Sequence, residues 1–218
     1  MTTYTDAVYE NGILAKLADV LAVARARTPQ TPARDEIDRV VRWLNSGAAM
    51  SAAMPVATLA ALVDLVAEEF SQGAEARLPQ PFMSQLALAA GDSDVLDFLG
   101  ATSVMLRASQ RDGARRFDDL PLAPWEAELR FAHLHAFAWW VEGDEYDSFE
   151  DGVLAGVASE HPYGCADLLP ALIAECHAVL LLEADEASSA ALRSVVPWAT
   201  GPVTREILRL ASAHLEDH

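Results

Sequence analysis

The sequence predicts an all-α fold, an irregular multi-helix bundle of about ten helices with two central buried helices. Three observations support this fold class. Apolar residues recur at helical spacing between glycine and proline breaks, and no segment alternates apolar and polar residues as strands do. Hydrophobic residues make up 52% of the 218 residues, enough to fill one core. We therefore expect a single all-α domain, 1–218, whose halves would be 1–111 and 124–218, joined by a loop.

Five helices are expected in the first half of the chain, each ended by a glycine, a proline or a polar turn. The second has the clearest limits, because Thr31 suits the N-cap, Pro32 suits the first turn and Gly47 follows the end. Asp92 or Ser93 is expected to cap the fifth. The expected ranges are 13–27, 32–46, 55–73, 81–91 and 94–111.

The second half is expected to contain the two central helices. The segment 112–124 has one glycine and two prolines among mixed charges, which predicts the longest loop. Ranges 125–142 and 168–184 are apolar on nearly every face, as buried helices are. Ser148 is expected to cap a helix, as is Asp167. The other expected helices are 149–160, 188–196 and 202–215.

The strong acidity of the chain bears on its partners. Its formal net charge is −18, with 15 basic and 33 acidic residues, so the whole molecule repels phosphate groups. Nucleic acids and anionic membranes are therefore poor partners. No uninterrupted apolar run approaches the roughly 20 residues of a membrane span, and segment 1–12 lacks the features of a secretory signal. These observations predict a cytoplasmic protein.

No cofactor or metal signature appears in the sequence. The chain has no phosphate-binding glycine loop, no Glu-x-x-His pair and no His-Glu-x-x-His motif. Cys165 and Cys176 lie too far apart for a zinc knuckle and are expected to be reduced thiols. We therefore expect neither a cofactor nor a metal, although a mixed site assembled from distant helices stays open.

Five residues are candidates for lining a ligand pocket between the two central helices. His135 and Trp139 share a helix face with Glu142, an arrangement that suits a general acid or a ligand. Core packing is the simpler interpretation of the aromatic residues. Cys165 lies near a helix N-terminus and close in sequence to His161, and a thiol in such a position can be reactive. The candidates are His135, Trp139, Trp140, Cys165 and His177.

Two further charged segments are expected to face water. Glu126, Arg130 and His133 follow helical spacing, which predicts an exposed charged stripe. The acidic run 142–151 does not match a calcium loop, because Phe149 occupies the position that needs glycine. This run is expected to be a solvated loop, or else a docking patch for a basic partner.

Two functions are compatible with these observations. The first is a non-catalytic helical interaction or regulatory protein whose acidic surface binds another protein or a second copy of the chain. The alternative is a small-molecule or metal-binding protein, or an enzyme, with a cavity between helices 125–142 and 168–184. A DNA-binding helix-turn-helix is disfavoured, because Asp35, Glu36 and Asp38 would face phosphates. Whether the protein is an enzyme stays open.

Overall fold

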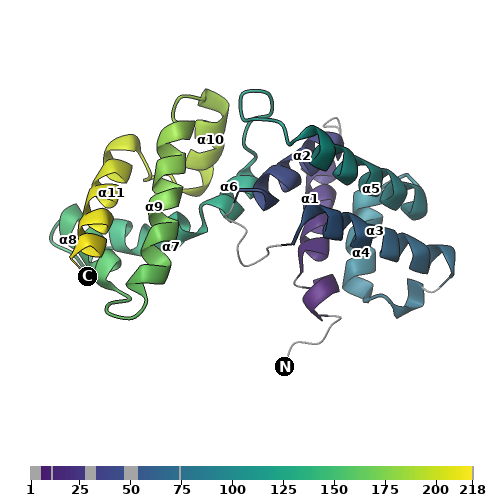
Figure 1. Ribbon diagram of the computed structural model, residues 1–218, viewed down its shortest axis with the longest axis horizontal. Helices are drawn as coiled ribbons and strands as arrows, with labels where there is room; N and C mark the ends of the chain where they lie inside the picture. The colour runs from purple at the N-terminus through teal and green to yellow at the C-terminus, as the bar shows by residue number, and fades with distance from the viewer. Residues whose placement is uncertain (1–5, 11, 28–32, 47–53, 74, 218) are drawn as a thin grey trace. The chain divides into compact units, whose positions relative to one another are not determined.

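The computed structural model describes residues 6–10, 12–27, 33–46, 54–73 and 75–217 (Figure 1). Within these ranges the regular elements are eleven α-helices and two short helical turns, with no strand, which confirms the all-α class. Contacts between residues divide the chain into two compact units, Met1–Arg115 and Arg116–His218. The division falls inside the segment 112–124 that the sequence predicts to be a loop. That the chain behaves as one domain stays a prediction.

Unit 1 contains the first five α-helices. In it α3 packs on α5 and α1 packs on α4, and α2 contacts both α1 and α5 (Figure 1). Its core includes Ile37, Leu59 and Leu106, none of which has any exposed surface. The helices are α1 (Ile13–Arg27), α2 (Ala33–Leu44), α3 (Val56–Ser71), α4 (Gln80–Ala90) and α5 (Val95–Asp112), with a π-helical turn at Asp6–Glu10 and a 3-10 turn at Glu75–Arg77.

A buried carboxylate ties α2 to the end of α5. Asp38 is 2% exposed and accepts hydrogen bonds from the Ser109 hydroxyl, from Arg34 Nε at 3.1 Å and from Arg115 Nε at 2.8 Å. A buried charge is costly unless it is paired and hydrogen-bonded. Arg34 belongs to α2 itself, so Ser109 and Arg115 are the donors that hold the end of α5 and the segment after it against α2.

Unit 2 is built around α9, which contacts α7, α8, α10 and α11 (Figure 1). Its core includes Phe131, Leu134, Leu169 and Ile207, all fully buried. The helices are α6 (Pro124–Arg130), α7 (Ala132–Glu142), α8 (Phe149–Ala158), α9 (Cys165–Leu182), α10 (Glu186–Val195) and α11 (Gly201–Glu216).

The expected helix 125–142 is wrong as one continuous element, because it is broken at Phe131. This residue has φ −115° and ψ 38°, ends α6 and precedes α7. Its ring is fully buried, so the break places a large apolar side chain in the core. The carboxylate of Glu175 on α9 accepts hydrogen bonds from the backbone N–H groups of His133 at 3.1 Å and Leu134 at 2.8 Å. A distant acidic residue thus caps α7.

The predicted caps are correct in one case and displaced in others. Ser148 caps α8 as expected, accepting a hydrogen bond from Asp151 N at 3.2 Å. Asp94, rather than Asp92 or Ser93, caps α5 and accepts from two backbone N–H groups. Those three residues are all good N-caps, so local preference alone does not choose among them. The predicted limits Thr31, Pro32 and Gly47 of the second helix lie outside the described residues.

Two helix starts in unit 2 also differ from expectation. Asp167 does not cap α9, which begins two residues earlier at Cys165, after Gly164. Helix α10 begins at Glu186 rather than Ser188, because Asp185 caps it by accepting from Ser188 N at 2.7 Å. Relative to the expected starts at residues 168 and 188, α9 is three residues longer at its N-terminus and α10 is two residues longer.

The two helices expected to be central are less buried than their composition suggests. In α7 only Leu134 and Phe137 are buried, and Trp139 is 65% exposed. In α9 one side is buried, yet Leu181 on another side is 80% exposed. Unit 2 has too few elements to cover every face of these helices.

Among the described residues one helix, α9, is long and apolar enough to cross a membrane by length and composition alone. Core helices of soluble proteins pass the same test. Glu175 lies on the buried side of α9 and bonds the start of α7, an arrangement typical of a helix packed in a protein core.

Candidate metal centre

Three side chains with metal-binding atoms meet where the start of α9 lies beside the end of α11. They are His161, Cys165 and His214, and one ligand atom from each lies within 4.8 Å of the other two. Cys165 is the first residue of α9, His161 precedes it by four residues, and His214 is in the last turn of α11. All three belong to unit 2.

Packing between α9 and α11 brings these residues together. Cys165 and His214 are 49 residues apart in the chain. Leu169 and Leu172 on α9, with Ile207 and Ala211 on α11, are buried in the same apolar cluster. These apolar contacts align the first turn of α9 with the last turn of α11, and the apolar pattern of both helices thereby positions the polar cluster.

The distances within the cluster fit a tetrahedral zinc ion. The Cys165 sulfur lies 3.3 Å from His214 Nε2 and 3.9 Å from His161 Nδ1. Zinc bonds of 2.3 Å to sulfur and 2.0–2.1 Å to nitrogen, at tetrahedral angles, place the two donors roughly 3.6 Å apart. The two imidazole rings are nearly perpendicular, at 84°, with centroids 5.5 Å apart. The two histidine nitrogens lie within 4.8 Å of each other, against roughly 3.4 Å in a tetrahedral site, so the imidazoles would move closer together on binding an ion.

The electrostatic surroundings of the cluster favour a cation held by a thiolate. Cys165 stands at the N-terminus of α9, where the helix dipole stabilises negative charge. Gly164 precedes it as a cap without a side-chain hydrogen bond, so the thiol is the first side chain at this end. The net charge of −18 also raises the local concentration of divalent cations.

The pocket candidates from the sequence lie at several separate places. Cys165 is in the cluster. Trp140 packs against Tyr146, with ring centroids 6.0 Å apart, and His177 is exposed on α9. His135 and Trp139 line an open hollow of about 620 Å³ together with acidic residues of the following loop. Trp140, Cys165 and His177 are not among the residues that line this hollow, so it does not unite the five candidates.

Sequence reasoning missed His214 and gave His161 only a minor part. The spacing of four residues between His161 and Cys165 suggests that they can approach each other. No local signal connects His214 to this pair, because it lies on another helix. Metal sites whose ligands come from distant segments have no spacing signature.

The expected exposed stripe on α6 and α7 is wrong. Glu126 has no exposed surface, and His133 is only partly exposed, with its Nδ1 2.7 Å from Glu175 Oε1. Because the helix breaks at Phe131, the residues before and after it no longer share one helical face. Helical spacing applies only within one continuous helix.

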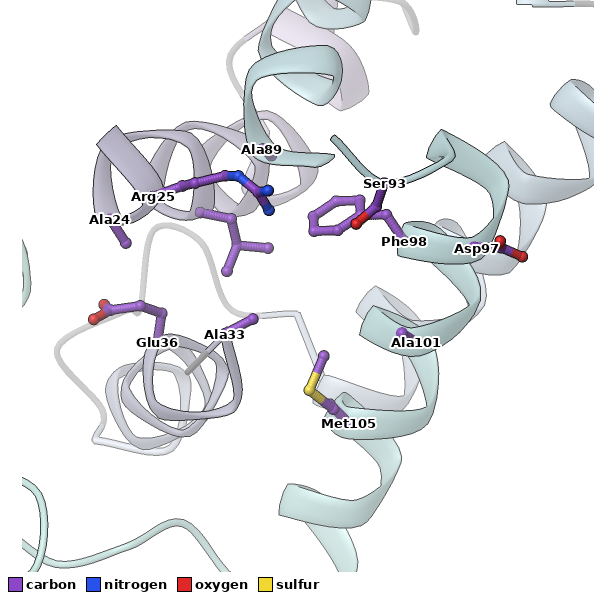
Figure 2. Close-up of a pocket in the computed structure, with 11 residues that line it drawn as sticks. Ala24, Arg25, Ala33, Glu36, Ala89, Ser93, Asp97, Phe98, Ala101 and Met105 are labelled. Atoms are coloured by element: carbon purple, nitrogen blue, oxygen red, sulfur yellow. The ribbon is translucent and has the colours of Figure 1, made fainter. Parts of the chain in front are cut away.

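Unit 1 has its own hollow, of about 470 Å³, between α1, α2, α4 and α5 (Figure 2). Arg25 and Phe98 reach into it from opposite sides, while Asp97 points away. Arg25 lies over Gly91, which has φ +60° and where an added Cβ would be 2.1 Å from Arg25 Nε. Glu36 at the edge is paired with Arg39 at 2.6 Å. This hollow has a mostly apolar lining and no group of converging metal ligands.

Comparisons with known proteins add no information about function. No family, no curated protein and no solved structure matches this chain. The cluster of His161, Cys165 and His214 is the feature of the described residues that bears most directly on function.

Proposed function

We propose that this protein binds a divalent transition metal ion, best fitted by zinc, through Cys165, His161 and His214. The observation that carries the proposal is the mutual approach of three donor atoms within 4.8 Å. The sequence had left open a mixed site assembled from distant helices, and this cluster is of that kind.

The donor types select the metal. A thiolate and two imidazoles suit zinc and other borderline or soft ions. Magnesium and calcium prefer carboxylate, carbonyl and water oxygens, and none of the three donors is an oxygen. Zinc also accepts the tetrahedral geometry that the sulfur–nitrogen distances of 3.3 and 3.9 Å approach.

The bound ion would join the two ends of a helix pair. His161 and Cys165 fix the start of α9, and His214 fixes the last turn of α11. Because the folded protein holds the donors together and the unfolded chain does not, metal binding stabilises the fold. A ligand at 100 times its Kd adds about 2.7 kcal/mol to the free energy of unfolding.

The test is zinc affinity, measured by competition with a chromophoric chelator. Cys165→Ala and His214→Ala should each weaken zinc binding by at least about 100-fold, since each removes a direct ligand. Cys176→Ala and His177→Ala are matched controls, because one residue is a buried thiol and the other an exposed histidine on the same helix. Both controls should bind zinc as the unmodified protein does.

Two results would overturn the proposal. One is a protein that binds less than one equivalent of zinc at micromolar concentration. The other is equal loss of affinity in the Cys165 and Cys176 variants while both remain folded by circular dichroism, because that pattern indicates no specific ligand.

A second candidate function is binding of another protein, and one observation favours it. Trp139 is 65% exposed in the hollow that it lines with Glu142, Asp144 and Glu145. An exposed aromatic residue beside carboxylates suits a partner that presents basic and apolar side chains. A cytoplasmic location and assembly into a homo-oligomer also stay predictions.

This candidate is tested by Trp139→Ala in a pulldown from the source cells. Trp198, which is partly buried and packed against the unit 2 core, provides the control Trp198→Phe. A stoichiometric partner retained by the control and lost by Trp139→Ala supports the proposal. Recovery of no stoichiometric partner by the unmodified protein argues against it.

A further inference from the structure

We infer that the metal keeps one coordination position open to solvent and takes a small anionic ligand there. This inference rests on the proposed function and names the class of ligand that the same site accepts. Three donors converge among the described residues, whereas zinc commonly takes four ligands. Three protein donors with an exchangeable fourth ligand are characteristic of zinc sites that act on other molecules.

The three donors differ in how far they are buried. Cys165 is 4% exposed, His214 is partly buried, and His161 is exposed. Exposure therefore increases from the sulfur on the inside to the His161 ring on the outside. We therefore assign the open coordination position to the side of His161, the most exposed of the three donors.

The charge of the centre selects an anion as the incoming ligand. A divalent ion with one thiolate and two neutral imidazoles keeps a net charge of about +1. The N-terminus of α9 adds positive potential at the same place, and Gly164 provides no side-chain cap for it. In the resting state water fills the position, and an anion displaces that water without any change in the protein donors.

Glu160 limits the size and charge of the ligand. Its side chain lies against the start of α9, with its Cβ 2.7 Å from where a Cβ on Gly164 would stand and a carboxylate oxygen 3.2 Å from that point. Glycine at position 164 makes this approach feasible. The carboxylate therefore lies beside the residue that precedes Cys165, and its negative charge opposes an incoming anion at this end of α9.

The experiment uses the full chain loaded with Co²⁺, whose visible absorption reports coordination, and sodium thiocyanate as the probe anion. Thiocyanate should change the spectrum saturably at one site per chain. Glu160→Gln should bind thiocyanate about threefold more tightly, because it removes a like charge at the rim. Glu183→Gln, at the other end of α9, is the matched control and should leave the thiocyanate affinity unchanged.

Several outcomes overturn the inference while leaving the proposed function intact. A cobalt spectrum of sulfur and nitrogen ligation that thiocyanate does not change means that the position is closed. If His218→Ala then makes the spectrum respond, the fourth donor is His218, which lies outside the described residues. If instead cobalt doubles the mass of the protein in solution, a second copy of the chain completes the site.

Equal thiocyanate affinity in Glu160→Gln and Glu183→Gln overturns the placement of the open side. Absence of any cobalt–sulfur absorption contradicts the proposed function itself.

Discussion

The two cysteines of this protein occupy chemically different places on one helix. Cys165, at the start of α9, lies 3.3 Å from His214 Nε2. Cys176, in the middle of α9, is fully buried in the apolar core of unit 2. Burial, aided by the neighbouring charge of Glu175, raises the pKa of the Cys176 thiol from 9.0 to about 12. Cys176 therefore stays a protonated core residue, and Cys165 is the thiol available for chemistry.

The raised pKa of Cys176 predicts a loss of stability in alkali. The folded state keeps the thiol protonated to about pH 12, whereas the unfolded chain ionises near pH 9.0. The stabilisation is fully present below pH 9 and is lost on the way to pH 12, at about 1.4 kcal/mol per pH unit. Urea unfolding at pH 8 and pH 10 measures this loss.

Cys176→Ala is the reference for that measurement, because it keeps every other titrating group. The stability difference between the unmodified protein and this variant should shrink by about 1.4 kcal/mol from pH 8 to pH 10. A constant difference over this range would show that the thiol ionises equally in both states.

At the scale of helices, the junction of α6 and α7 depends on one carboxylate from α9. Glu175 is 7% exposed and accepts hydrogen bonds from two backbone N–H groups of the first turn of α7. It also lies 2.7 Å from the His133 ring. Charge-assisted bonds to buried donors are among the stronger single contacts in proteins. The interruption of the helix at Phe131 is therefore stabilised by a tertiary contact from α9.

Replacing Glu175 by glutamine should lower the free energy of unfolding by about 2 kcal/mol, because a neutral amide is a weaker acceptor for the two N–H groups. Glu183→Gln on the same helix is the control. Its side chain is 38% exposed and pairs loosely with Arg205 at 3.7 Å, so its loss should cost less than about 0.5 kcal/mol. Equal effects of the two variants in urea unfolding would contradict the capping role.

In unit 1, the buried carboxylate of Asp38 connects two helices in the way that Glu175 does in unit 2. Its side chain is 3% exposed and is bonded by Arg34, Arg115 and Ser109. Asp38→Asn should destabilise the protein by about 3 kcal/mol, because the arginines lose their buried partner. Asp64→Asn removes an exposed ion pair with Arg107 and should cost less than about 1 kcal/mol. Thermal unfolding compares the two, and a larger loss for Asp64→Asn would refute the assignment.

At the scale of the whole molecule, the chain consists of two compact units, and the features described above divide between them. Unit 1 contains the buried Asp38 with its hydrogen-bond donors and the hollow beside Arg25. Unit 2 holds all three donors of the metal centre. The proposed metal centre therefore lies within unit 2.

Limited trypsin digestion should cut first after Arg116, at the boundary of the units. The Arg116 side chain is 84% exposed in an irregular segment, whereas Arg115 is bonded to Asp35 and Asp38. Proteases need exposed and locally irregular backbone. Mass spectrometry should show fragments 1–116 and 117–218, and the second should retain zinc. A first cut within a helix of either unit would contradict this division.

Features encoded within a few neighbouring residues could be predicted from the sequence. The all-α class followed from helical spacing and from glycine and proline breaks. The cap at Ser148 and the loop at 112–124 are likewise local, since turn and cap chemistry involves residues that are close in the chain. Cys165 was already a candidate for chemistry, because a thiol at a helix start has a recognisable pattern.

Only the tertiary structure decided the features that join distant residues. The break at Phe131 depends on Glu175 of another helix, and helical spacing across it gave the wrong surroundings for Glu126. His214 approaches Cys165 because α11 packs on α9. Local preferences favour a helix wherever apolar residues recur at helical spacing. Which helix ends lie side by side is determined by how the helices bury their apolar surfaces. The helices could therefore be predicted from the sequence, whereas the proposed metal centre depends on how α9 and α11 pack.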